Sequence, residues 1–301
     1  MQKLVSVIIP TYSRPKFIIR TIESVLKQTY FPIEIIVVDD NGIGTENQKH
    51  TEKILAPYIQ QKRISYIPHE VNKNGSAARN TGIKASHGEY VTLMDDDDEM
   101  MSDKIKKQVA AIEKSNGKYH ASYCGVEKRF GPRVMSRKIP SREGNLQKEL
   151  LLGTWGIGSG SNPLFCREVF DNVGFFDESF WRKQDVEMMV RFFRKYQIAK
   201  VEEVLLVKNS DSVPRRPDPL AYQKIIEKFL DTFAYDIEKY PKPIQDKIRF
   251  GLWFTNAQLA MNASCYKVGF DCVKRASSYK RLSIKNWLQL MKQALLKRQM
   301  R

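Results

Sequence analysis

Short apolar runs alternate with helical patterns over the first hundred residues of this 301-residue chain, and this alternation limits the possible folds most. The runs at residues 4–9 and 33–38 are rich in β-branched side chains and are closed by polar residues or proline, as buried parallel strands are. Further strands are predicted at 64–67 and 90–94. Apolar residues recur at helical spacing in the intervening segments, which predicts helices after Arg14, over 46–55 with a stop at Pro57, and over 77–85. The order strand, helix, strand predicts an α/β fold.

Three polar clusters follow predicted strands directly, at residues 10–12, 39–41 and 95–98. Ligands of open α/β sheets bind beyond the carboxyl ends of the strands. We therefore expect the three clusters to meet at one site.

Four consecutive carboxylates, Asp95 to Asp98, follow the apolar run at residues 90–94. Like charges repel strongly in a partly buried site, whereas Mg²⁺ and Mn²⁺ take oxygen ligands and usually keep phosphate oxygens and waters. A divalent cation carrying a phosphate is thus the expected counter-charge. The alternative is a solvated acidic turn that caps a helix beginning near Ser102.

Four sequence blocks, in order, carry a family resemblance: residues 5–12, 34–40, 74–82 and 94–98. Together they resemble the nucleotide-sugar half of glycosyltransferase family 2, whose enzymes have the GT-A fold. A further block at 173–178, followed by Asp185, extends the resemblance to about residue 215. It implies a Rossmann-like, mostly parallel sheet flanked by helices, with a helical C-terminal appendage outside the resemblance.

The resemblance also implies roles for individual residues. Asp40 matches the carboxylate that accepts the uracil imide hydrogen, and either Asp95 or Asp96 matches the one that holds the ribose. In this DXD-type motif the family places the metal-binding carboxylate before a short segment that leads to an Asp like Asp103, so Asp97 is the expected ligand of Mn²⁺ or Mg²⁺, with Asp98 as the alternative. The other residues expected to bind the nucleotide-sugar are Pro10, Thr11, Tyr12, Asn74, Gly75 and Arg79.

The residues of segment 74–82 also suggest, by their own chemistry, how this segment would bind a nucleotide. Gly75 permits a turn, and a helix opening at Ala77 or Ala78 would direct Arg79 and free backbone amides toward a nucleotide, where negative charge is favoured. The alternative is that Arg79 forms a surface salt bridge and the glycines only shape a loop.

Asp185 is the expected general base. It lies near the start of a predicted helix, where the resemblance places an acidic pair; Gln184 replaces the first member, and the second is the one that the family uses. Asp185 would take the proton from an acceptor hydroxyl as it attacks the anomeric carbon, and a single displacement inverts the configuration. The alternative is that Asp185 only caps the helix, with Glu187 complementing its dipole.

Two tryptophans are candidates for acceptor binding. Trp155 lies in the glycine-rich segment 153–163, and Trp181 precedes Asp185. Their flat apolar faces suit sugar rings, although either could equally be a core anchor.

Length and composition fit a catalytic domain over 1–215, divided into a nucleotide-sugar half (1–100) and an acceptor half (101–215), and a basic helical region over 216–301. The proline-rich segment 210–219 marks the boundary. It could also be a mobile loop whose Arg215 and Arg216 meet the diphosphate.

The formal net charge of +16 is concentrated near the C-terminus, where residues 265–301 hold ten basic side chains against Asp271. Interleaved apolar residues suit a helix on an anionic membrane surface, or a basic face of a helix that packs on the domain or on a subunit. No nucleic-acid-binding motif accompanies the charge, which argues against that partner.

No apolar run approaches the length of a membrane-spanning helix, so we expect a cytoplasmic protein, peripheral on the inner membrane face. The four cysteines lack metal spacing and fit free thiols, and no histidine is assigned a role.

The predicted activity is transfer of a hexosyl or N-acetylhexosaminyl group from a UDP-sugar to a glycan or lipid-linked acceptor, as in capsule or other surface polysaccharide synthesis. The alternatives are a non-catalytic nucleotide-sugar binding module, which has no need of Asp185, and a nucleotidyltransferase. The latter would usually carry a glycine-rich basic loop after its first strand, and residues 10–15 form no such loop.

Overall fold

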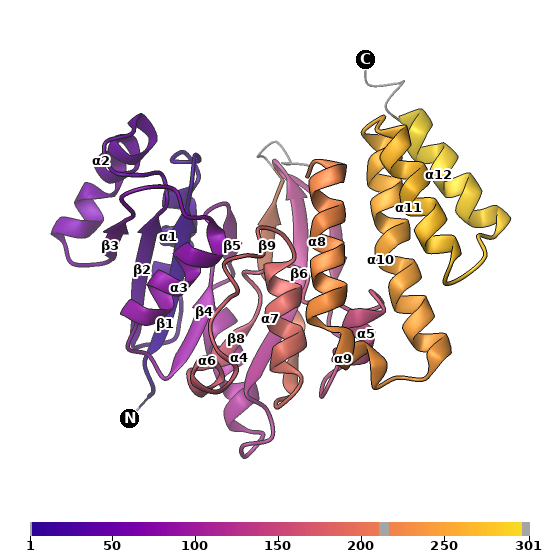
Figure 1. Cartoon of the computed structure of the whole chain (residues 1–301). Helices are drawn as coiled ribbons and strands as arrows, with labels where there is room; N and C mark the ends of the chain where they lie inside the picture. Colours follow the sequence, from indigo (N-terminus) through magenta and orange to yellow (C-terminus); the bar gives the residue numbers. More distant parts are fainter. Residues whose placement is uncertain (1, 211–216, 297–301) are drawn as a thin grey trace. The chain divides into compact units, whose positions relative to one another are not determined.

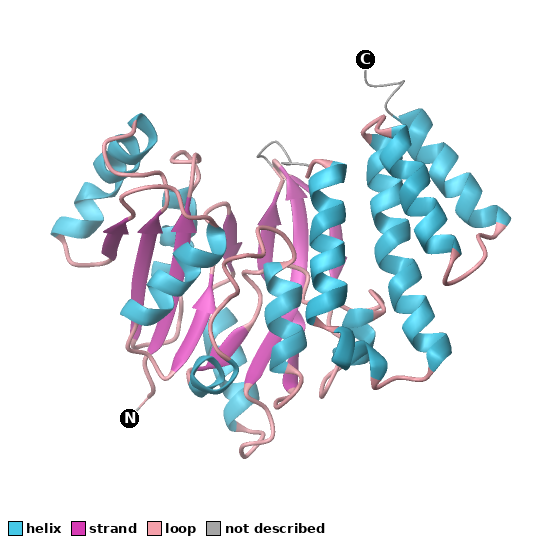
Figure 2. Cartoon of the chain, in the orientation of Figure 1, coloured by secondary structure: helices cyan, strands magenta, loops and turns pink. Residues whose placement is uncertain are grey.

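The computed structural model describes residues 2–210 and 217–296 of the chain (Figure 1). Two compact units are present: Met1–Gln147 with Ile157–Pro214, and Lys148–Gly156 with Arg215–Arg301. The first contains the sheet, and the second is helical (Figure 2). The predicted loop role of Arg215 and Arg216 lies outside the described residues.

The first four strands form a parallel sheet in the order β3-β2-β1-β4. The strands are β1 (Val5–Thr11), β2 (Ile33–Asp39), β3 (Ser65–Pro68) and β4 (Tyr90–Leu93), and the helices that connect them are α1 (Ile18–Leu26), α2 (Glu46–Gln60) and α3 (Gly75–Ala85). This part confirms the predicted strand and helix alternation.

Both faces of this sheet are buried. Val7 and Ile9 of β1 pack in one cluster with Ile18 and Ile22 of α1, and side chains of alternate strand positions face the other side, where α3 packs on β1 and β2. Continuous apolar strands are what burial on both faces requires.

The remaining strands extend the same sheet in the order β4-β8-β6-β9-β5 and make it mixed. The pairs β4–β8, β8–β6 and β9–β5 are antiparallel, and β6 and β9 are parallel. The hairpin strand β7 pairs with β6. The elements are β5 (Asp98–Met100), α4 (Lys104–Glu113), β6 (Ala121–Phe130), β7 (Arg133–Lys138), β8 (Leu164–Cys166), α6 (Glu168–Val173), α7 (Gln184–Phe192) and β9 (Ile198–Asn209). The predicted parallel arrangement therefore holds for β1 to β4, and antiparallel pairs complete the sheet.

Two predicted boundaries are wrong. Helix α2 continues through Pro57 to Gln60, because a proline in the last turn removes only one hydrogen bond while Tyr58 packs on the core and donates to Glu23 at 2.7 Å. Helix α3 opens at Gly75 instead of Ala77, because the side-chain oxygen of Asn74 accepts hydrogen bonds from the backbone of Ser76 and Ala77.

The second unit is built from helices with their own apolar cluster, which includes Trp253, Phe254 and Cys272. Its helices are α8 (Pro219–Thr232), α9 (Ala234–Glu238), α10 (Lys242–Asn262), α11 (Tyr266–Ser277) and α12 (Ile284–Leu296), and α5 (Gln147–Leu151) lies at the junction of the two units in the chain. None of the helices in residues 2–210 and 217–296 combines the length and the apolar character needed to cross a bilayer.

Candidate active site

The ends of β1 and β4 meet, as the sequence predicts. Thr11, the last residue of β1, donates a hydrogen bond to Asp96 at 2.7 Å, and its carbonyl accepts one from the backbone of Asp40 at 2.9 Å. Pro10 pairs with β2 in register, and Tyr12 is 40% exposed beside this edge of the sheet. The three polar clusters therefore lie on one side of the sheet.

The four carboxylates of the acidic run divide into two kinds. Asp96 and Asp98 are buried, with exposed fractions of 0% and 1%, whereas Asp95 and Asp97 are only partly buried. The alternative of a solvated acidic turn is wrong, because half of the run is inside the protein. Asp95 and Asp97 are the carboxylates that a ligand can reach.

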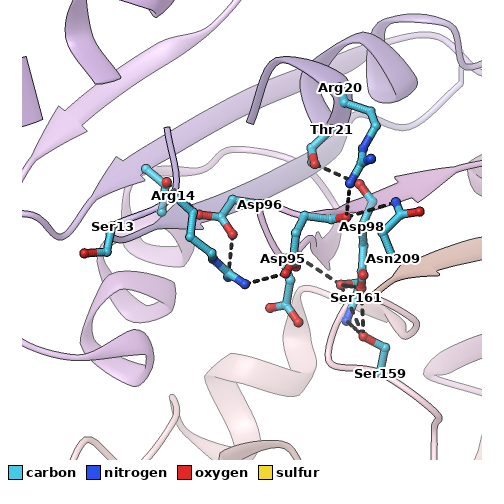
Figure 3. A network of polar contacts seen from close by, with 12 residues as sticks. Ser13, Arg14, Arg20, Thr21, Asp95, Asp96, Asp98, Ser159, Ser161 and Asn209 are labelled. Atoms are coloured by element: carbon cyan, nitrogen blue, oxygen red, sulfur yellow. Dashed lines mark hydrogen bonds and ion pairs between the residues drawn. The ribbon is translucent and has the colours of Figure 1, made fainter. Parts of the chain in front are cut away.

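The buried carboxylates anchor the segment (Figure 3). Asp98 accepts hydrogen bonds from Ser159 at 3.0 Å and Ser161 at 2.7 Å, and Asp96 forms an ion pair with Arg14 at 2.5 Å. Burial raises the pKa of Asp96 to about 6 and, together with the nearby charge of Asp95, raises the pKa of Asp98 to about 7. Asp98 therefore suits a structural role better than the metal role held open for it.

The backbone of the run is held equally firmly. Ser161 accepts from the amide of Asp95 at 2.9 Å, and the carbonyl of Asp97 accepts from Arg20 and Asn209, each at 3.0 Å. A segment fixed by partners from four other parts of the chain presents its carboxylates in one geometry. Such preorganisation is what binding of a charged ligand requires.

Three basic side chains lie beside the partly buried carboxylates of Asp95 and Asp97. Arg14 bridges Asp96 and Asp97, and Arg79 donates to Asp95 at 2.9 Å. Burial alone would lower the pKa of Lys208, but its attraction to Asp98, Asp95, Asp97 and Asp185 holds that pKa above the usual value. Arg14 and Lys208 belong to no site predicted from the sequence.

Arg79 lies in the second turn of α3 because the helix opens at Gly75. A Cβ at Gly75 would be 3.1 Å from the guanidinium of Arg79, so glycine leaves room for that side chain above the helix start. Arg79 is mostly buried and paired with Asp95, so the alternative of a surface salt bridge is wrong.

Asn74 holds the loop before α3 in place. Its backbone amide donates to Asp40 at 2.9 Å and its side-chain amide donates to the carbonyl of Glu178 at 3.0 Å. Its φ of 101° and ψ of 166° lie in a region that residues other than glycine rarely adopt, and these hydrogen bonds hold it there.

Asp40 is 2% exposed, and its carboxylate already accepts four hydrogen bonds. The donors are His69 Nδ1 at 2.7 Å, Asn72 Nδ2 at 2.8 Å, and the backbone amides of Lys73 at 2.8 Å and Asn74 at 2.9 Å. These bonds use the four lone-pair positions of a carboxylate. A nucleobase could bond to Asp40 only by displacing one of these donors, a constraint that the sequence did not reveal because His69 and Asn72 lie about 30 residues further along the chain.

Asp185 is the second residue of α7 and is partly buried. The residue at the helix cap is Lys183, and Glu187 is buried in an ion pair with Arg191 at 2.6 Å, so the purely capping alternative for Asp185 does not describe this helix. Asp185 contributes to the raised pKa of Lys208, as do Asp95 and Asp97. Lys208 thus links the predicted base electrostatically to the carboxylate run.

The two tryptophans differ in placement. Trp181 is 39% exposed, and its carbonyl accepts a hydrogen bond from Gln184 next to Asp185 at 2.9 Å. Trp155 is partly buried and belongs to the second unit. Its acceptor role stays a prediction.

The partly buried carboxylate of Asp97 fits a divalent cation of the kind that proteins hold with one or two carboxylates, phosphate oxygens and waters. Asp97 would supply the protein ligand. Among the described residues no cluster of three or more side chains suited to a metal is present, so the other ligands would have to come from a bound diphosphate and water.

Comparison with solved structures defines the class of fold. The chain is similar to TarS residues 1–349 of S. aureus, with a TM-score of 0.60 at 16% identity over 99% of this chain and 92% of that one. It is also similar to the mannosyltransferase PcManGT of Pyrobaculum calidifontis, solved with GDP-Man and Mn²⁺, with a TM-score of 0.60 at 19% identity over 98% of this chain and 81% of that one. The chain has the GT-A fold, with helices at its C-terminus, as predicted.

The model of the family described as "Glycosyl transferase family 2" matches residues 6–174, and the chain belongs to this family. Similar proteins include the amylovoran biosynthesis glycosyltransferase AmsB of Erwinia amylovora, 30% identical over 62% of each chain. Another is the glycosyltransferase GlyG of Streptococcus pneumoniae, 28% identical over 84% of this chain and 83% of that protein. The match spans less than two thirds of AmsB, and 33% of an uncharacterized Rickettsia conorii glycosyltransferase that is 32% identical.

Proposed function

We propose that this chain is an inverting glycosyltransferase that moves a hexosyl or N-acetylhexosaminyl group from a UDP-sugar to a hydroxyl of a glycan or lipid-linked acceptor. The observation that carries the proposal is the acidic run at residues 95–98, which hydrogen bonds hold in one conformation. Asp95 and Asp97 remain partly accessible beside Arg14, Arg79 and Lys208. Asp185 also attracts Lys208 and raises its pKa, as Asp95 and Asp97 do. A binding module would have no need of Asp185 at this position.

Each residue has a role in the proposed reaction. Asp95, oriented by Arg79, holds the ribose, and Asp97 holds Mn²⁺ or Mg²⁺. The metal, when bound, would offset the charge that develops on the leaving diphosphate. Lys208 adds a positive charge to the same region, since it is partly buried beside the carboxylates, whose charges hold its pKa above the usual value.

Asp185 accepts the proton of the acceptor hydroxyl. A carboxylate at the start of a helix, with its own neighbour Val186 donating to it at 2.9 Å, keeps one orientation. Trp181 provides an apolar face close to it in the chain, which fits a sugar acceptor.

UDP is the proposed nucleotide because Asp40 lies at the end of β2, where the family resemblance places the uracil acceptor, and because TarS has been solved in complex with UDP. We propose that the imide of uracil replaces the side-chain amide of Asn72, since the other three donors belong to the backbone or to a ring held by Thr81. The membrane-facing, cytoplasmic location and a role in capsule or other surface polysaccharide synthesis belong to the same proposal.

Calorimetric titration of UDP, GDP, CDP and ADP, with and without Mn²⁺, tests the donor site. We expect UDP to bind most tightly and only with the metal, and Asp97→Asn to weaken that binding at least about tenfold, because one carboxylate ligand is lost. Preference for another nucleotide would overturn the assignment of UDP.

Asp98→Asn is the matched control for Asp97→Asn. The Asp98 carboxyl has its pKa raised to about 7 and accepts from two serines, so the isosteric amide keeps an acceptor oxygen for them. We expect this variant to retain metal-dependent binding. Loss of binding in Asp98→Asn, with retention in Asp97→Asn, would assign the metal to Asp98.

A further inference from the structure

Helix α12 turns its apolar side chains toward solvent. Ile284, Trp287, Leu288, Met291 and Leu295 recur at the three- and four-residue spacing of one helix face, and their exposed fractions range from 44% to 81%. We call these five residues the apolar stripe. A surface helix normally packs such a stripe against the core.

The opposite face of α12 is the one that packs inward. Leu290 is 3% exposed in the cluster that contains Trp253 and Met261, and the side chain of Gln293 accepts a hydrogen bond from Asn262 at 3.1 Å. These contacts with α10 fix the rotation of α12 about its axis. The stripe therefore faces outward in the folded unit.

The charge around the stripe has one sign. Lys285 and Lys292 are exposed on α12, Lys280 and Arg281 precede it, and residues 272–296 contain no aspartate or glutamate. Tryptophan and lysine next to an apolar stripe are typical of helices that lie in the headgroup region of a bilayer. Anionic lipid complements both features, because its phosphates meet the ammonium groups while its acyl chains cover the stripe.

We propose that α12 is a membrane-docking helix that lies in the surface of an anionic bilayer, with the apolar stripe below the phosphates and Lys285 and Lys292 against them. A second copy of the chain fits less well, because an isologous contact between two such helices would bring basic side chains against basic side chains. The proposal concerns where the chain works and holds independently of the reaction it catalyses.

Co-sedimentation of the full chain with vesicles tests this inference. Vesicles of equal parts phosphatidylcholine and phosphatidylglycerol should bind the chain at least tenfold more strongly than vesicles of phosphatidylcholine alone. Leu288→Asp and Met291→Asp should each weaken binding to the anionic vesicles at least tenfold, because each places a carboxylate within the stripe.

Tyr235→Asp is the matched control, since Tyr235 is a 72% exposed aromatic residue on α9, outside the stripe. It should bind as the unchanged chain does. All three substitutions are at exposed positions of the second unit, and far-UV circular dichroism of the full chain checks that each variant is folded. The Trp287 fluorescence should shift to shorter wavelength on anionic vesicles and the shift should be lost in Trp287→Phe.

Three results would overturn the proposal. The first is that the unchanged chain binds neither kind of vesicle. The second is that Leu288→Asp and Met291→Asp bind anionic vesicles as well as Tyr235→Asp does. The third is a dimer in analytical ultracentrifugation that Leu288→Asp dissociates, which would assign the stripe to a second copy.

Discussion

Asp95, Asp96, Asp97 and Asp98 are chemically identical side chains that the fold places in different surroundings. Asp96 and Asp98 are inside the protein, where desolvation raises their pKa values to about 6 and about 7. Burial disfavours the charged form of Asp95 as well, but Arg79, Lys208 and Arg14 outweigh this and lower its pKa. The surroundings of each side chain therefore decide its part: Asp96 and Asp98 hold the segment in place, and Asp95 and Asp97 remain available to a ligand.

This division explains how far the site can be predicted from sequence. The acidic run, Arg79 and Asp185 follow from their places in recognisable blocks. The alternation of buried and accessible carboxylates does not, because it depends on Arg14, Ser161 and Lys208, which lie far away in the chain. The assigned roles of the individual site residues remain predictions that the variants above test.

Lys104 is a residue whose effect on stability can be measured. It is 0% exposed, its Nζ has no hydrogen-bond partner within the described residues, and burial lowers its pKa to about 8. Replacing an ammonium group in such a place by an apolar side chain of similar volume should be stabilising. We expect Lys104→Met to raise the free energy of unfolding at pH 7 by about 1–3 kcal/mol, measured by urea denaturation.

The pH dependence has a definite sign. Between pH 8 and the ordinary lysine pKa of 10.5, the unfolded chain binds more protons at this residue than the folded one, so its contribution to stability rises as pH rises. The gain from Lys104→Met should therefore shrink toward pH 10.5. Lys106→Met, at an exposed position of the same helix, should change stability by less than about 0.5 kcal/mol, and a destabilised Lys104→Met would show that the ammonium is needed.

At the scale of elements, the strands with the clearest sequence signal are β1, β2 and β4, which are largely buried, whereas β3, which was also predicted, is only partly buried. Strands β1, β2 and β4 are continuous apolar runs, which sequence patterns reveal directly. Strand β7 is exposed along its whole length, and β5 has only three residues, two of them acidic, so neither carries an apolar signal. Their pairing with β6 and β9 comes from tertiary contacts that no local pattern encodes.

Packing of α3 on the sheet gives a prediction at this scale. A Cβ at Gly82 would be 2.3 Å from Cγ2 of Ile8, which is 0% exposed in the centre of β1. Although alanine is the better helix former, Gly82→Ala should lower the free energy of unfolding by about 1–3 kcal/mol, because the helix is overpacked against the strand. Urea denaturation provides the measurement.

Gly251→Ala is the matched control for Gly82→Ala, because the added methyl group would meet no neighbouring side chain. It lies inside α10, and no atom is within 4 Å of the position of a Cβ. Gly251→Ala should therefore stabilise the chain by about 0.5–1 kcal/mol. Ile8→Ala should relieve part of the cost of Gly82→Ala in the double variant, and equal effects of the two glycine substitutions would refute the packing argument.

At the scale of the whole molecule, the chain folds into two units with separate apolar clusters. The first contains every residue assigned to the donor and the base, and the second contains the basic helices. We retain 1–215 and 216–301 as the proposed domains. The structure places residues 148–156, which include Trp155, in the second unit. A single boundary near residue 215 would assign these residues to the first domain.

The proposed site is a property of the first unit as a whole, because it draws on the end of β1, the acidic run, α7 and β9, which are spread over about 200 residues. Its central claim is that donor binding and proton abstraction are separate tasks of different segments. A substitution at Asp185 should therefore abolish turnover and leave binding intact.

Hydrolysis of UDP-glucose, UDP-galactose and UDP-N-acetylglucosamine, followed as release of UDP, tests this claim without an identified acceptor, since water takes the place of the hydroxyl. With whichever donor the unchanged chain hydrolyses, Asp185→Asn should slow UDP release at least about 100-fold, the usual effect of losing a general base, while calorimetric binding of UDP changes less than about twofold. Glu46→Gln, which removes an exposed carboxylate from the first turn of α2, should change neither. Release of UDP by Asp185→Asn at the unchanged rate, with normal UDP binding, would contradict the account.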